Sequence, residues 1–214
     1  VRNGTLGLRV TVTRKEGFDA PITVRHLWNP PGISSQPTIK IPKGQNEIIY
    51  TLTANSGAPL LTWQIAVMGE SDAGNGQILA SSALVPITIA EPYLGMKIEM
   101  AAVEQGKAGA VVCKLTQSTP FEGKAKVKLL GLPAKVSSPE IEIDKTTTEI
   151  SFPVSIAPDS PKGQHKNLFC HLTIPVAGTS IPHNVGHGGV LRIDPPPKKG
   201  LYTNKYSAPK LLIK

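Results

Sequence analysis

Short runs of alternating apolar and polar residues recur along the chain and predict β-strands. Leu8, Val10 and Val12 share one face of residues 8–13, which is the period of a half-buried strand. Twenty prolines and twenty glycines leave almost no window in which an amphipathic helix could form. We therefore expect a nearly all-β protein. The expected strands are residues 8–13, 22–27, 38–41, 47–54, 63–68, 84–89, 96–100, 111–116, 124–130, 140–143, 149–156, 168–174 and 189–193.

The pattern of strands and turns occurs twice along the chain. Residues 18–35 match residues 121–138 at an offset of 103, and residues 39–59 match residues 141–161 at an offset of 102. We therefore expect a tandem repeat of one unit. A chain of 214 residues is long enough for two such domains, each with its own core.

Seven short strands in the second unit, which repeat those of the first, fit an antiparallel, two-sheet sandwich of the immunoglobulin-like kind, although strand pattern alone is also compatible with a barrel. We assign residues 1–91 to a first β-sandwich, 92–195 to a second and 196–214 to a Pro/Lys-rich tail. The linker at 90–93 is too short for a free joint. The first unit lacks the apolar run at 96–100, so we expect that its opening strand is missing and that the chain is a processed or excised piece.

The formal charge of +8 does not indicate a specific nucleic-acid partner. Five lysines lie in the last twenty residues, and the remaining +3 is interleaved with acids along the strands. A basic tail supplies only the non-specific, salt-sensitive part of nucleic-acid affinity. We therefore expect no specific nucleic-acid partner. No apolar run is long enough to span a membrane, so we expect no membrane span either.

The two cysteines are the first candidate site. Under the repeat, Cys113 takes the place of Val10 and Cys170 that of Ile65, both on inward faces. Their separation along one domain matches the inter-sheet bridge of immunoglobulin-like sandwiches, and we expect a disulfide. The alternative is two reduced thiols acting as small buried hydrophobes.

We expect no metal and no other cofactor. His171, His183 and His187 could converge on zinc, but the glycines and proline around the last two argue against a helix that would pair them, and hydrogen bonds to loop backbone are the simpler interpretation. The acidic loop at residues 70–76 offers oxygens to calcium without the spacing of a calcium loop.

Nothing in the chain predicts catalysis. It has no Gly-x-Ser-x-Gly turn, no acid placed to orient a histidine and no glycine-rich phosphate loop that opens a helix. We therefore expect that the protein is not an enzyme.

Trp28 is the candidate ligand-binding residue. The second copy has Gly131 in its place, so the fold does not require an indole there, and a sugar-stacking platform and a contact between the domains are both hypotheses. Trp63 is predicted to face inward, and we favour core packing as its role.

Three segments of the second unit resemble a known family. They are residues 163–170 (GQHKNLFC), His183-Asn184 and residues 188–196 (GGVLRIDPP), and residues 120–123 (PFEG) also belong to it. The chain resembles the C-terminal tandem immunoglobulin-like region of large secreted bacterial proteins that carry pre-peptidase C-terminal domains. The resemblance covers residues 6–197 and implies export and a multidomain parent, but no catalytic residue.

Together these features predict a non-enzymatic structural and interaction module of an exported bacterial multidomain protein. Its partners would be neighbouring domains or envelope proteins, and its location would be secreted or in the cell envelope, at the cell surface or in the periplasm. The alternative is a carbohydrate-binding accessory module of a secreted hydrolase, with a polysaccharide as its partner.

Overall fold

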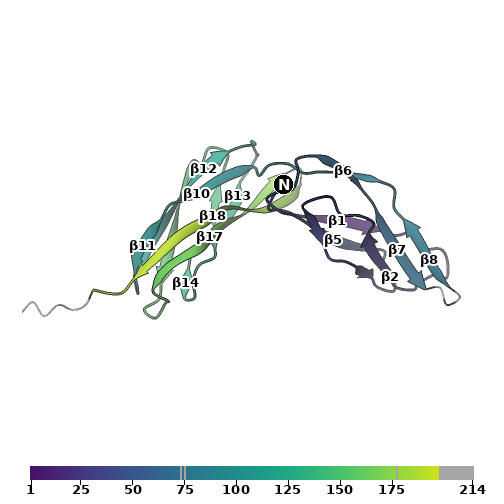
Figure 1. Ribbon diagram of the computed structural model, residues 1–214, viewed down its shortest axis with the longest axis horizontal. Helices are drawn as coiled ribbons and strands as arrows, with labels where there is room; N and C mark the ends of the chain where they lie inside the picture. The colour runs from purple at the N-terminus through teal and green to yellow at the C-terminus, as the bar shows by residue number, and fades with distance from the viewer. Residues whose placement is uncertain (73, 75, 177, 198–214) are drawn as a thin grey trace, which may run out of the picture.

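The chain folds into two all-β sandwiches. The computed structural model describes residues 1–72, 74, 76–176 and 178–197, and every regular element in those residues is a β-strand (Figure 1). The sheets are antiparallel apart from one parallel pair, β11 with β18. The expected immunoglobulin-like, two-sheet architecture is confirmed. None of the described residues forms a helix able to cross a membrane.

The first sandwich contains β1 to β9. One sheet has the order β1-β5-β3, and the facing strands have the order β4-β2-β7-β8, with β6 and β9 paired beside them. The strands are β1 (Thr5–Thr11), β2 (Ile22–His26), β3 (Ile33–Ser35), β4 (Ile39–Ile41), β5 (Glu47–Ala54), β6 (Thr62–Ile65), β7 (Val67–Asp72), β8 (Gln77–Ser81) and β9 (Val85–Thr88).

The second sandwich contains β10 to β18. Its sheets have the orders β10-β12-β16-β14 and β11-β18-β17-β13-β15. The strands are β10 (Leu94–Ile98), β11 (Ala101–Glu104), β12 (Ala108–Gln117), β13 (Ala125–Leu130), β14 (Val136–Ser137), β15 (Ile141–Ile143), β16 (Glu149–Ile156), β17 (Gly163–Val176) and β18 (Thr179–Asp194).

Positions that match in the sequence occupy matching places in the two sandwiches. Val10 on β1 pairs with Ile48 on β5, as Cys113 on β12 pairs with Ile150 on β16. All four are less exposed than their neighbours along strands of period two, which places one face of each sheet against the opposite sheet. The two sandwiches therefore bury equivalent side chains between two layers.

The last two strands of the second sandwich are much longer than the sequence pattern predicts. We expected strands at 168–174 and 189–193, whereas β17 and β18 form one hairpin that runs most of the length of the sandwich (Figure 1). Gly186 and Gly188 have φ of 70° and 89° and let β18 continue through a register shift. In the first sandwich the equivalent strand is interrupted at Ala66, which separates β6 from β7.

The cores differ in extent. The second sandwich has one continuous apolar core to which both sheets contribute, and Phe152 within it is fully buried. The first has a cluster around Tyr50 and a separate small one formed by Ala54, Ala58 and Ile89. The first sandwich is thus the less completely packed of the two.

Candidate functional site

A groove of about 600 Å³ opens between the two sheets of the first sandwich. One wall is β1 and the other is formed by β7, β8 and β9. Ile78 and Val85, which line it, are 45% and 44% exposed, so the groove is open to solvent. Its walls are mainly apolar and include Leu8, Val10, Val12, Val67, Ile78 and Val85.

Two strand edges beside this groove have no partner strand among the described residues. β1 pairs only with β5, and β9 pairs only with β6. In the second sandwich, β10 covers the equivalent edge of β12, and β11 covers that of β18. An unpaired strand edge presents backbone donors and acceptors that can bind another strand.

Strongly exposed large apolar side chains concentrate in the first sandwich. Burial of such side chains is the main favourable term in folding, so a surface rich in them indicates a missing contact. They are Leu6, Leu27, Trp28, Ile49, Leu60, Leu61, Ile78, Leu79, Leu84 and Val85, against Met100 in the second sandwich.

The two tryptophans contact each other in the first sandwich. Their ring centroids lie 5.6 Å apart in an edge-on arrangement. Trp63 packs against Ala54, Ala58 and Ile89, as predicted for a core residue, and its buried indole N–H has no hydrogen-bond partner among the residues that the structure describes. Trp28 is 49% exposed, so part of its side chain is accessible to a ligand.

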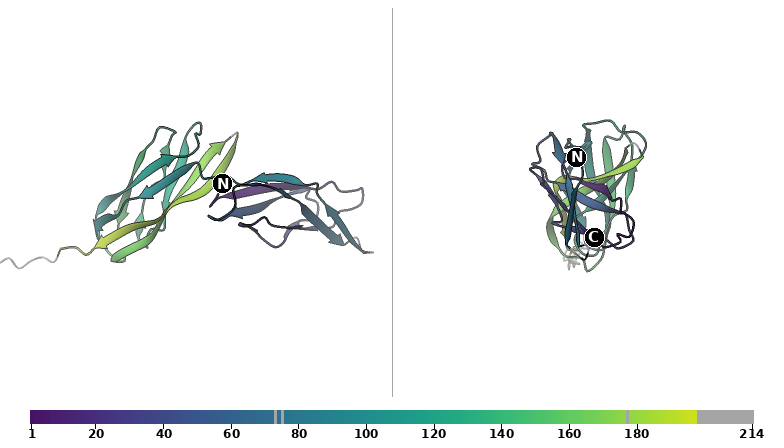
Figure 2. Two further views of the ribbon diagram at one scale, coloured as in Figure 1. Left: turned by 45° about the horizontal axis from the view of Figure 1, so that its top comes forward. Right: turned by 90° about the vertical axis from the view of Figure 1, so that its right-hand side faces the viewer.

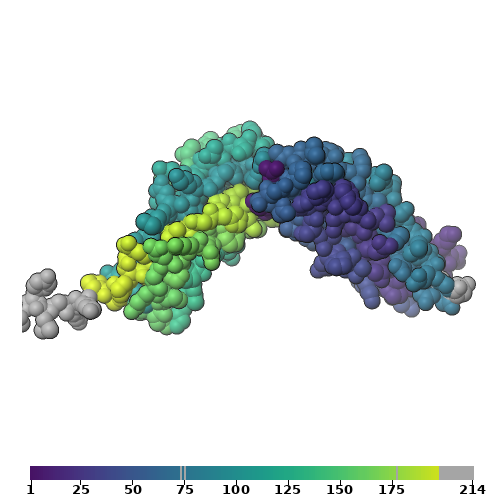
Figure 3. Space-filling model, viewed as in Figure 1, coloured from purple at the N-terminus to yellow at the C-terminus, as the bar shows by residue number. Residues whose placement is uncertain are grey.

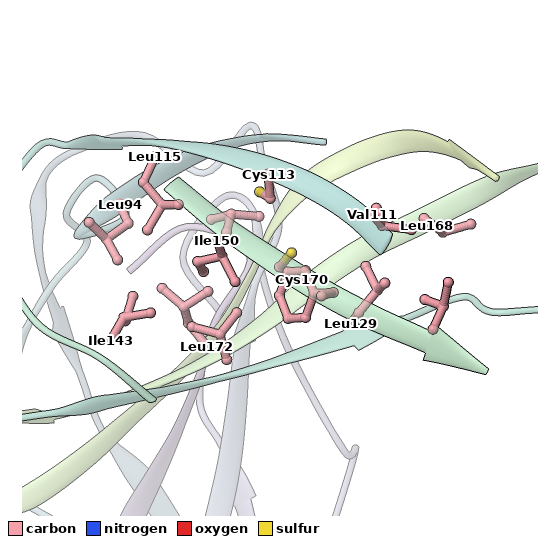
Figure 4. Packing of buried hydrophobic residues seen from close by; sticks show 14 of the residues in the cluster. Leu94, Val111, Cys113, Leu115, Leu129, Ile143, Ile150, Leu168, Cys170 and Leu172 are labelled. Atoms are coloured by element: carbon pink, nitrogen blue, oxygen red, sulfur yellow. The ribbon is translucent and has the colours of Figure 1, made fainter. Parts of the chain in front are cut away.

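The two cysteines lie on opposite sheets of the second sandwich. Cys113 on β12 and Cys170 on β17 are both fully buried, and their sulfurs point into the same interior space (Figure 4). Both are free thiols in this structure. The hydrogen bond with Cys113 and burial raise the pKa of the Cys170 thiol, so this thiol is protonated at neutral pH. The disulfide stays a prediction.

The three candidate histidines do not converge. His171 donates a hydrogen bond from Nδ1 to Asn184 Oδ1 at 2.8 Å, and His187 stacks on Phe169 with centroids 5.1 Å apart. His183 is buried, and burial lowers its pKa to about 4. The expectation that His183 and His187 lie in a loop was wrong, because both lie on β18.

The described residues contain no group of three or more side chains placed to hold a metal ion. The first three residues of the loop considered for calcium, residues 70–72, belong to β7, which extends to Asp72, and β8 begins directly after the loop at Gln77. Asp72 accepts a hydrogen bond from the Gly74 N–H at 2.8 Å, which is an ordinary turn contact. Ala73 and Asn75 lie outside the described residues.

No family model matches the chain, and neither does any curated protein. Among solved structures, it is similar to a protein of unknown function from Porphyromonas gingivalis W83, with 9% identity over 86% of this chain and 89% of that chain and a TM-score of 0.26. It is also similar to the D0-D1 domain of Intimin, with 12% identity over 85% and 88% and a TM-score of 0.27. Similarity at this level says nothing about function.

The groove is the feature that the sequence did not predict. The pattern predicted that the first unit lacks an opening strand, but not that there is a hollow between its sheets. The signal was present at β8, where Ile78 and Leu79 are apolar neighbours on a strand that is exposed along its whole length.

Proposed function

We propose that the chain is a non-enzymatic pair of β-sandwich modules from an exported bacterial multidomain protein, acting as spacer and interaction surface for neighbouring domains or envelope components. The observation that carries this proposal is the junction between the sandwiches, where direct hydrogen bonds replace a free joint. Figures 2 and 3 show the two bodies meeting end to end in an arch.

The junction joins the start of the chain to the long hairpin of the second sandwich. Gly4 forms an isolated antiparallel bridge with His183. The Asn184 N–H donates a hydrogen bond to the Asn3 carbonyl at 2.9 Å. Backbone contacts of this kind fix direction as well as distance, because N–H donors need aligned acceptors.

The linker is also held on both sides. Arg2 forms an ion pair with Glu91 at 2.8 Å and donates from Nε to the Ala58 carbonyl at 2.8 Å. The Tyr93 carbonyl accepts hydrogen bonds from Ser118 and Thr119. A linker bound to both neighbours supports a spacer of nearly constant angle.

Pulsed electron resonance between spin labels tests the spacer. Lys15→Cys and Lys162→Cys place labels on exposed sites at the outer ends of the two sandwiches. We expect a narrow distribution of label separations, and a broad one in a control variant with four glycines inserted after Glu91. Equally broad distributions in both proteins would contradict the proposal.

Polysaccharide binding is the second candidate, favoured by the half-exposed ring of Trp28. An array of polysaccharides would detect saturable binding. Leu27→Ala is the matched control, because Leu27 is an equally exposed neighbour. Loss of binding in Trp28→Ala but not in Leu27→Ala would establish polysaccharide binding as the role in place of the spacer. Turnover of any esterase, protease or glycosidase substrate would contradict both candidates.

A further inference from the structure

The first four residues form a tight turn at the foot of β1. The Gly4 N–H donates a hydrogen bond to the Val1 carbonyl at 3.2 Å. Asn3, the third residue, has a left-handed backbone with φ of 55°, a conformation that asparagine tolerates better than most residues. The chain therefore reverses direction before β1 begins.

The second sandwich contains the same turn between β11 and β12. There the Lys107 N–H donates to the Glu104 carbonyl at 3.1 Å, and Gly106 is left-handed with φ of 78°. Glu104 is the last residue of β11. Val1 thus stands where a strand ends in the second sandwich.

Two further hydrogen bonds attach each turn to its own sandwich, one near the end of the last strand and one at the end of the strand next to β1 or β12. The turns are therefore equivalent in position as well as in form. The bonds run from Arg2 N–H to Ala90 O (3.0 Å) and Ala54 N–H to Gly4 O (3.0 Å), and from Gln105 N–H to Asp194 O (2.8 Å) and Ile156 N–H to Lys107 O (3.0 Å).

In the second sandwich the strands ahead of this turn close the gap between the sheets. β10 pairs with β12, and β11 then crosses to pair with β18. Leu94 and Val103 are buried, and Met96 and Ile98 pack against the core, while Lys97 between them is exposed. A ten-residue stretch with apolar residues at alternate positions thus fills the space that is open in the first sandwich.

We propose that the groove of the first sandwich binds an extended polypeptide strand with apolar side chains at alternate positions, namely the segment joined to the amino side of Val1 in the parent polypeptide. This strand pairs antiparallel with β1 and then parallel with β9. Its apolar side chains cover Val10, Ile78 and Val85. The turn at residues 1–4 favours this occupant over a strand from another molecule, which would need no such turn. The site adds to the spacer role and does not depend on it.

A graft tests the proposal. The ten residues 94–103 are copied directly ahead of Val1, which reproduces the register of the second sandwich. The matched control carries serine at the positions that copy Leu94, Met96 and Ile98. Hydrogen exchange of the amides in β1 and β9 is the first readout. Fluorescence during urea unfolding is the second, because both tryptophans lie in the first sandwich.

We expect the graft to slow exchange of alternate β1 and β9 amides roughly tenfold or more and to raise the urea midpoint of the first sandwich, with little effect from the serine graft. The same ten residues added as a free peptide should protect the same amides more weakly. Protection by neither graft nor peptide, or equal protection by both grafts, would overturn the proposal. Protection of these amides in the ungrafted chain that grows with protein concentration would also overturn it, since a second copy would then be the occupant.

Discussion

Single residues explain why the two sandwiches differ on their surfaces. Gly131 occupies the position that Trp28 has in the first sandwich, and the backbone of the second sandwich requires glycine there. The backbone at Gly131 is left-handed, with φ of 74°, and a Cβ there would clash with the Asn167 carbonyl oxygen. The long β17–β18 hairpin thus crowds a position that stays open in the first sandwich.

Gly131→Ala should therefore destabilise the second sandwich by more than backbone strain alone. Gly123→Ala is the matched control, because Gly123 has φ of 79° but its nearest neighbour would be 3.9 Å away. We expect a loss of about 1 kcal/mol in the control and about 3 kcal/mol or more in Gly131→Ala, measured by urea unfolding. Equal losses would show that the backbone near Asn167 yields without cost.

His183 makes the second sandwich sensitive to acid. Its folded pKa of about 4 lies below the ordinary value of 6.5, so the unfolded chain binds the proton more tightly. The free energy of unfolding should fall by about 2 kcal/mol between pH 7 and pH 5, and this loss continues toward pH 4. Urea unfolding followed by circular dichroism measures it. His183→Gln should remove most of that pH dependence, and an unchanged slope would refute the assignment.

At the scale of elements, the sequence predicts strands where alternation is regular and fails where glycine or proline breaks it. β5 agrees to the residue with the expected 47–54, because every second residue from Ile48 to Ala54 is apolar and less exposed than its neighbours. β18 was predicted at a third of its length, because Pro182, Gly186 and Gly188 imitate a loop. Ladder pairing with β17 outweighs those local signals, and pairing between distant residues is not visible in local pattern.

The candidate sites follow the same division. The positions of Cys113 and Cys170 follow from strand alternation, so their burial on opposite sheets was predictable. The groove exists because no strand covers the edges of β1 and β9 among the described residues. The types of residue in these strands do not indicate whether a neighbouring strand is present.

The predicted disulfide between Cys113 on β12 and Cys170 on β17 can be tested directly. In protein recovered from an oxidising compartment, mass spectrometry without reductant should find both thiols joined. Reduction should then lower the free energy of unfolding by about 4 kcal/mol, the chain-entropy value for a loop of this length. Two free thiols after exposure to oxidant would favour the alternative of small buried hydrophobes.

At the scale of the whole molecule, the chain combines a complete sandwich with an open one. The complete body has a continuous core, with β10 and β11 covering the edges of β12 and β18, and the open body carries most of the exposed large apolar side chains. Such asymmetry is expected of a module that is completed by its neighbour on one side.

The parallel pair β11 and β18 has a mechanical consequence. Tension drawn along the polypeptide enters the second sandwich beside the junction at Leu94 and leaves at Asp194 on the far end, so it drags these strands lengthwise past each other and loads all their hydrogen bonds together. When this chain is pulled from its two ends, the force on the first sandwich acts between Val1 and Ala90, which are neighbours, so it peels that sandwich open one hydrogen bond at a time. Single-molecule pulling should show two well-separated rupture forces, the weaker belonging to the body that holds the tryptophans.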